Sequence, residues 1–78
     1  MLTDYINGAM RHAEYEQEDG RWYCRIPGLQ GLWADGSTVE ECRTELRSAL
    51  EDWILFGLVN GYPVPPVDGI DLTTAKVA

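Results

Sequence analysis

The side chains in this sequence that could carry out chemistry are few, and they are spread along the chain. Cys24 and Cys42 are the only cysteines, and His12 is the only histidine. A structural zinc site needs four such ligands with close spacing between pairs, so these three residues cannot complete one. Each cysteine falls on the expected inward face of its element, where burial makes a thiol inert. We therefore predict no metal site and no cysteine nucleophile.

Carboxylates are the other groups that could act in catalysis, as metal ligands of a nuclease. The candidates are Asp4, Asp19, Asp35 and Asp52. Asp19 and Asp35 each stand directly before a glycine, and a turn explains that position. A general acid, base or nucleophile also needs a partner within hydrogen-bonding distance, and the sequence shows no such constellation. The chain is predicted to be no enzyme and to bind no cofactor.

The overall charge favours a protein over a nucleic acid as partner. Thirteen Asp and Glu residues against six Lys and Arg residues give a net charge of −7, which repels a phosphate backbone. We therefore expect no strong direct binding of nucleic acid. An acidic surface suits a basic protein, although solubility alone explains the same charge. With two cysteines and no stretch typical of a signal peptide or a membrane span, we expect a cytoplasmic location and no membrane contact.

The elements that must position these residues begin with a short helix and a hairpin. Apolar side chains recur at offsets of three and four over residues 3–12, which predicts a short amphipathic helix. Asp19-Gly20 separates residues 14–18 from residues 21–27, and this dipeptide predicts a two-residue hairpin turn. Residues 32–34 are long enough for a third strand before Asp35-Gly36. The three strands should form one antiparallel meander.

A long helix should follow the third strand. Thr38, with Glu41 three residues later, predicts its start, and Asn60-Gly61 predicts its end. The first four turns carry an apolar stripe that should pack on the sheet. The last turns are apolar nearly all round, which is more than one small sheet can cover, so we expect a homo-oligomer (dimer or tetramer), with burial under the proline-rich segment that follows as the alternative. The expected oligomer interface is Ile54, Leu55, Phe56, Leu58 and Val59.

Together these elements predict an α+β fold in a single domain over residues 1–78, because a chain of this length has room for one core. The sheet should be three- or four-stranded and antiparallel, with the long helix packed on it and the short helix at the N-terminus. The fourth strand is expected from Ile70 and Leu72, which alternate with polar residues after prolines that keep the chain extended.

Three runs of sequence resemble a known family in their order and spacing. They are Ile26-Pro27-Gly28-Leu29-Gln30-Gly31, then Asp35-Gly36-Ser37-Thr38-Val39-Glu40-Glu41, then Ala49-Leu50-Glu51-Asp52-Trp53-Ile54. Over roughly residues 14–66 the chain is similar to the HicB-type antitoxins. The resemblance implies a partial ribonuclease H-like fold that lacks the metal carboxylates of that enzyme, and no catalysis. It also implies a partner, a small basic HicA-type toxin that cleaves messenger RNA, whose active site the antitoxin covers.

The chain departs from the family pattern at three points. Leu32 stands where the family has a corner cysteine, the N-terminal helix is outside the usual pattern, and no DNA-binding motif follows the core before Ala78. Many family members repress their own operon through such a C-terminal DNA-binding domain. We therefore expect DNA binding by this chain to be weak.

A basic toxin would meet the acidic hairpin. We expect Glu16 and Glu18 to attract it and Trp22 and Tyr23 to anchor it. Two alternatives remain: the hairpin charges only keep a sheet edge soluble, or the protein is a stand-alone structural or regulatory homo-oligomer with no toxin partner.

Overall fold

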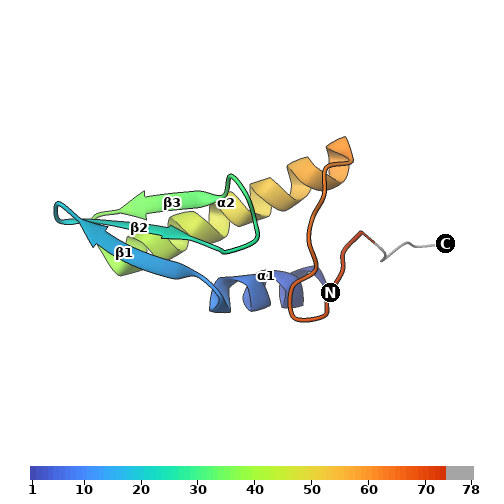
Figure 1. Cartoon of the computed structure of the whole chain (residues 1–78), viewed down its shortest axis with the longest axis horizontal. Helices are drawn as coiled ribbons and strands as arrows, with labels where there is room; N and C mark the ends of the chain where they lie inside the picture. Colours follow the sequence, from blue (N-terminus) through green and yellow to red (C-terminus); the bar gives the residue numbers. More distant parts are fainter. Residues whose placement is uncertain (74–78) are drawn as a thin grey trace.

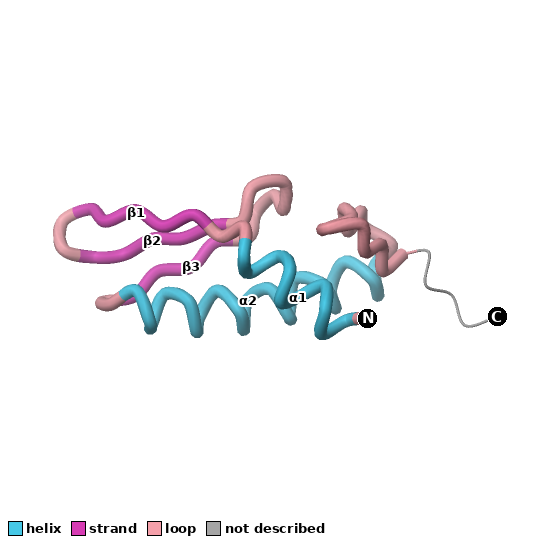
Figure 2. The backbone as a smooth tube through the Cα atoms, turned by 90° about the horizontal axis from the view of Figure 1, so that it is seen from below, coloured by secondary structure: helices cyan, strands magenta, loops and turns pink. Residues whose placement is uncertain are grey.

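The computed structural model describes residues 1–73, which form a sheet with two helices. The element order is α1 (Leu2–Arg11), β1 (Glu14–Glu18), β2 (Arg21–Arg25), β3 (Trp33–Gly36) and α2 (Val39–Asn60). The strands form one antiparallel sheet in the order β1-β2-β3. The long helix α2 runs beside the sheet and extends well past it, while α1 lies beyond the opposite end of the strands from the hairpin turn (Figures 1 and 2). The α+β fold predicted from the sequence is confirmed.

Local turn and cap chemistry explains where these elements begin and end. Asp19 and Gly20 have φ values of 52° and 78°, the positive values that a two-residue hairpin turn of this kind requires. Thr38 Oγ1 accepts a hydrogen bond from the Glu41 amide at 3.1 Å, which satisfies one of the free donors at the start of α2. At its end Gly61 adopts the left-handed conformation, with φ of 71°.

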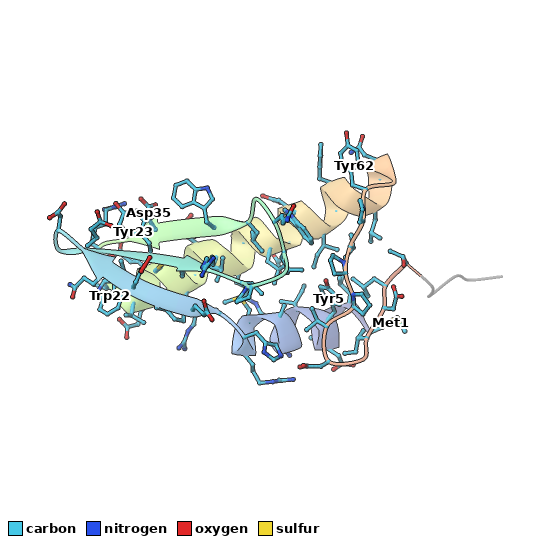
Figure 3. All side chains as sticks on the ribbon, in the orientation of Figure 1. Met1, Tyr5, Trp22, Tyr23, Asp35 and Tyr62 are labelled. Atoms are coloured by element: carbon cyan, nitrogen blue, oxygen red, sulfur yellow. The ribbon has the colours of Figure 1, made fainter. Side chains whose placement is uncertain are left out.

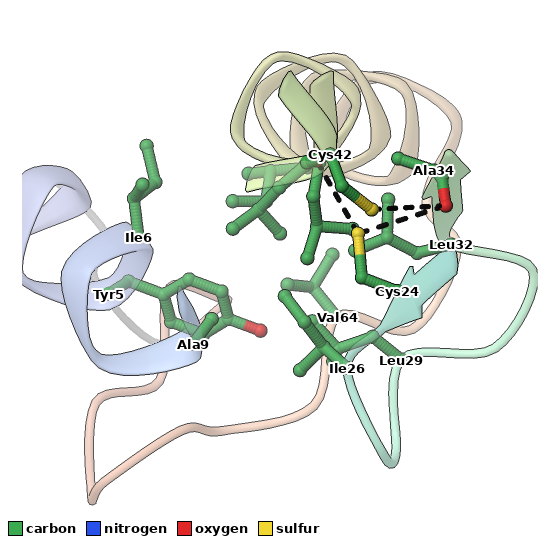
Figure 4. Close-up of a cluster of buried hydrophobic side chains, with 13 residues drawn as sticks. Tyr5, Ile6, Ala9, Cys24, Ile26, Leu29, Leu32, Ala34, Cys42 and Val64 are labelled. Carbon is green, nitrogen blue, oxygen red and sulfur yellow. Dashed lines mark hydrogen bonds between the residues drawn. The ribbon is translucent and has the colours of Figure 1, made fainter. Parts of the chain in front are cut away.

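The core lies between α2, α1 and the helix-facing side of the sheet (Figure 4). It contains Tyr5, Ile6, Ala9, Cys24, Ile26, Leu29, Leu32, Ala34, Cys42, Leu46, Leu50, Ile54 and Val64. The Sγ atoms of Cys24 and Cys42 both lie near the carbonyl oxygen of Ala34, at 3.7 and 3.6 Å. Both cysteines are buried and unbridged, as the sequence predicted. Burial raises the pKa of the Cys24 thiol to about 12, because a thiolate would lose its hydration there.

The segment after α2 turns back and ties α1 to the rest of the molecule. Gly57 makes this reversal possible, since a Cβ at that position would lie 2.9 Å from Val64 Cγ2. The Tyr5 hydroxyl donates a hydrogen bond to the carbonyl oxygen of Pro65 at 2.6 Å. The Asp68 carboxylate contacts Arg11 Nη2 at 3.3 Å and His12 Nε2 at 2.7 Å. These contacts hold a helix of only ten residues, which would be marginal alone.

The predicted fourth strand is wrong. Val67 and Ile70 form only an isolated bridge with each other, because the chain reverses between them at Asp68 and Gly69, which have φ values of 50° and 78°. Ile70 therefore pairs within its own turn, and Leu72 lies in a second turn. The last five residues of the predicted domain, 74–78, lie outside the described part of the chain.

Ile54 also differs from its prediction. Its side chain is 2% exposed and belongs to the core, so it is not available to a second molecule. The buried stripe of α2 runs through Leu46, Leu50 and Ile54, whereas Trp53 is half-buried and donates a hydrogen bond from Nε1 to the carbonyl oxygen of Gln30 at 3.0 Å. The other four predicted interface residues, Leu55, Phe56, Leu58 and Val59, are exposed.

A candidate binding face on the sheet

One face of the sheet has no helix against it. In β2 and β3 the side chains of Cys24 and Ala34 point into the core, and strand alternation sends their neighbours to the other side. Figure 2 shows α2 running along only one side of the strands. The uncovered face, called the open face below, carries Glu14, Glu16, Glu18, Arg21, Tyr23, Arg25, Trp33 and Asp35.

The centre of the open face is hollowed and aromatic. A solvent-open cavity of about 550 Å³ lies here, with Glu16, Tyr23 and Trp33 among its lining residues. Tyr23 pairs directly with Glu16 on β1 and with Asp35 on β3, and Figure 3 shows Tyr23 and Asp35 close together near the hairpin end. Trp33 is the diagonal neighbour of Tyr23, roughly 7–8 Å away in such a pair. It is 61% exposed, against 37% for Tyr23.

The charges on the open face are only partly compensated. Arg21 Nε lies 3.0 Å from Asp35 Oδ2, and Arg25 Nη2 lies 3.3 Å from Glu14 Oε1. The hydrogen bond to Asp35 raises the pKa of the Arg21 guanidinium. Both arginines of the face are thus paired, whereas Glu16 and Glu18 form no ion pair with any other residue in 1–73. The two uncompensated charges are negative, and Glu16 lies directly beside Tyr23.

Three of the four residues predicted to meet a partner lie on this face. Glu16, Glu18 and Tyr23 are exposed there. Trp22 is not among them, because neighbouring residues of a strand point to opposite faces. Its side chain is half-buried and packs against the core, so the prediction that grouped it with Tyr23 on one surface is wrong.

Trp33 is the residue that sequence reasoning missed. The run Leu32-Trp33-Ala34 predicts a strand without assigning a role to its tryptophan, although alternation with a small inward alanine would have pointed the ring outward. Its exposure supplies the larger of the two ring surfaces on the open face.

This arrangement is suited to binding a cationic surface. The rings of Tyr23 and Trp33 present negative π faces, which attract ammonium and guanidinium groups, and Glu16 and Glu18 add formal charge. Among residues 1–73 no three His, Cys, Asp or Glu side chains are grouped as metal ligands. Neither α1 nor α2 is long and apolar enough to cross a bilayer, and these are the helices of the described chain.

The fold and this face define a small α+β protein of two layers, with helices on one side of an antiparallel sheet and an acidic, aromatic surface on the other. The chain belongs to the UPF0150-like family, a small HicB-like family that it matches over residues 4–65.

A solved protein is similar to this chain over nearly its whole length. It is TTHA0281 from Thermus thermophilus, with 43% sequence identity and a TM-score of 0.80, and the match covers 91% of this chain and 93% of that one. No curated protein matches the chain.

Proposed function

We propose that this chain is a non-enzymatic antitoxin of the HicB type, which neutralises a small basic HicA-type toxin by covering its messenger-RNA-cleaving site. The observation that carries the proposal is the open face, where Tyr23 and Trp33 stand exposed beside the carboxylates of Glu16 and Glu18. Membership of a HicB-like family supports it. The site of action would be the cytoplasm, where messenger RNA is translated.

The open face suits a basic protein for two separate reasons. A surface that binds RNA must itself be positive, so the uncompensated charge of Glu16 and Glu18 would accelerate its encounter with this face. Once docked, exposed aromatic side chains such as Tyr23 and Trp33 lose water and contribute most of the affinity, as at other interface hot spots. Charge is therefore expected to control association and the rings to control dissociation.

The test is to co-express the chain with the basic protein of the neighbouring reading frame and to measure association and dissociation rates. The Glu16→Lys/Glu18→Lys variant should associate roughly tenfold more slowly at low salt, with a smaller difference at high salt. Trp33→Ala should leave association unchanged and raise the dissociation rate about 30-fold, the effect of a loss near 2 kcal/mol.

A matched control variant distinguishes the effect of charge on the open face from the effect of overall net charge on the association rate. Glu40→Lys/Glu45→Lys makes the same charge change on exposed positions of α2 and should change the association rate much less. Equal slowing by both double variants would remove the open face from the interface. Failure of the wild-type chain to bind the neighbouring basic protein, or to relieve its toxicity, would refute the antitoxin proposal.

A second candidate function is that of a stand-alone structural or regulatory homo-oligomer with no toxin. The observation that favours it is the exposed apolar surface near the end of α2, where Leu55, Phe56 and Val59 are 58–73% exposed. Under this alternative the chain would self-associate normally and bind no neighbouring toxin, so the same binding experiment distinguishes the two.

A further inference from the structure

The C-terminal end of α2 carries an apolar surface that its own chain leaves uncovered. This end patch consists of Leu55, Phe56, Leu58, Val59 and Tyr62, whose side chains are 44–73% exposed. The rings of Phe56 and Tyr62 pack together at 5.5 Å between centroids. In Figures 1 and 3 this part of α2 projects beyond the strands, with Tyr62 near its tip. A contiguous apolar patch of this kind usually marks an interaction site.

The returning segment covers only the other side of the helix. Val64 is 3% exposed and packs against Gly57. The chain then passes α1, where Pro65 contacts Tyr5 and Asp68 contacts Arg11. Ile54 and Gly57 are buried on that side, while Leu55 and Val59 lie on the opposite side and Leu58 lies at the edge between them. The proline-rich segment therefore buries one side of the apolar end of α2. The end patch on the opposite side stays exposed unless another molecule binds it.

The distribution of charge indicates which molecule binds the end patch. No charged residue occurs between Asp52 and Asp68, although the whole chain carries a net charge of −7. A basic partner would find no carboxylate to pair with inside the end patch. A second copy of the chain would be repelled by most of the acidic surface, and it would meet the least repulsion here. An uncharged patch on a strongly acidic molecule thus suits self-association.

The placement of the flanking acids also sets the orientation. Asp52 is seven residues from Val59 and on the same side of the helix, which places it about 10 Å away along the axis. If two copies of α2 cross antiparallel near Val59, their Asp52 carboxylates lie on the order of 20 Å apart, beyond the Debye length of about 8 Å at physiological salt. In a parallel pair the same two carboxylates would face each other across an interaxial distance of about 8–10 Å.

We propose that the end patch pairs with the end patch of a second copy, with the two α2 helices antiparallel about a two-fold axis near Val59. The inference does not depend on the antitoxin proposal. The end patch lies at the opposite end of the molecule's 49 Å long axis from the hairpin turn (Figure 1), and its residues are distinct from those of the open face.

The first test is the molar mass of the wild-type chain in solution, by light scattering at tens of micromolar. The expected mass is twice the 8.8 kDa of the chain, and Leu55→Glu/Val59→Glu should reduce it to a single chain. Both residues are highly exposed, so circular dichroism should show that the variant stays folded. The control Gln17→Glu/Gln30→Glu adds the same charge at exposed positions elsewhere and should remain dimeric. A monomeric wild type, or an oligomer that the Leu55/Val59 variant leaves intact, would overturn the proposal.

The second test addresses orientation by oxidative cross-linking. Val59→Cys should form a disulfide between copies because it lies near the two-fold axis, and Asp52→Cys should not. Native Cys24 and Cys42 are buried, so the wild-type chain provides the background. Cross-linking of Asp52→Cys as fast as Val59→Cys would refute the antiparallel arrangement.

Discussion

Replacing Ile54 or its neighbour Leu55 with alanine should affect stability very differently, although both residues are apolar and adjacent on α2. Ile54 is 2% exposed and Leu55 is 62% exposed. An alanine at a buried isoleucine removes its packing and leaves a cavity, which costs about 2–5 kcal/mol. A domain of 78 residues has a free energy of unfolding of roughly 4–12 kcal/mol. Ile54→Ala should therefore remove a large fraction of the stability, while Leu55→Ala should change that of the single chain by about 0.5 kcal/mol or less.

Urea and thermal denaturation followed by circular dichroism measure this difference. For a domain of this size each kcal/mol shifts Tm by roughly 4–8 °C, so the loss of about 2–5 kcal/mol in Ile54→Ala should lower Tm by about 8–40 °C. Ile54→Val, which costs about 0.5–1.5 kcal/mol, gives a milder variant that stays folded. The Ile54→Ala and Leu55→Ala variants should be measured at several protein concentrations. A loss of stability caused by dissociation of a dimer depends on protein concentration, whereas a loss caused by poorer core packing does not. Equal, concentration-dependent losses at Ile54 and Leu55 would refute the assignment of Ile54 to the core.

Three further predictions concern the tail, the strand–helix contact and the thiols. The hydrogen bond with His12 is the main cause that holds the pKa of Asp68 below its usual 3.8. The stabilisation that the ionised Asp68 carboxylate contributes is present above pH 3.8 and is lost as the pH falls through the lowered pKa. Asp68→Asn should therefore lower Tm at neutral pH and have a progressively smaller effect on Tm in acid. Gly36→Ala places a Cβ 2.7 Å from the Cys42 amide nitrogen and should destabilise the domain by about 1–3 kcal/mol in urea titrations; an unchanged midpoint would contradict this close approach. Cys24, with its pKa raised to about 12, should resist iodoacetamide at pH 8 until urea unfolds the chain, as mass spectrometry of the modified protein will report.

Features that depend on a few neighbouring residues could be predicted from the sequence. The hairpin turn needs positive φ at two positions, and Asp19-Gly20 supplies them. The start and end of α2 likewise follow from Thr38 and Gly61. In each case the hydrogen bond or backbone conformation lies within a few residues of the side chain that causes it, so no tertiary contact is needed.

Features set by distant contacts could not be predicted in the same way. Trp53 and Ile54 are both apolar, and a rotation of about 100° between them decides which enters the core. The packing of the folded chain places Ile54 there and leaves Trp53 at its edge. The turn at Asp68-Gly69 has positive φ values like those of Asp19-Gly20, so it follows from a local pattern. The contacts of Asp68 with Arg11 and His12 do not, because no local pattern encodes that pairing. On the open face, the role of Trp33 could not be predicted from its own three-residue run, because the face forms only when β3 pairs with β2 and brings Trp33 beside Tyr23.

The contacts between α1 and the returning segment have a consequence for folding during synthesis. Tyr5 bonds to Pro65 and Arg11 to Asp68, partners separated by 60 and 57 positions along the chain. During synthesis α1 therefore precedes both partners by most of the described chain, and these contacts can form only after Pro65 and Asp68 have left the ribosome. Such long-range pairing slows folding, so a nascent chain that ends before residue 65 would hold α1 without these partners.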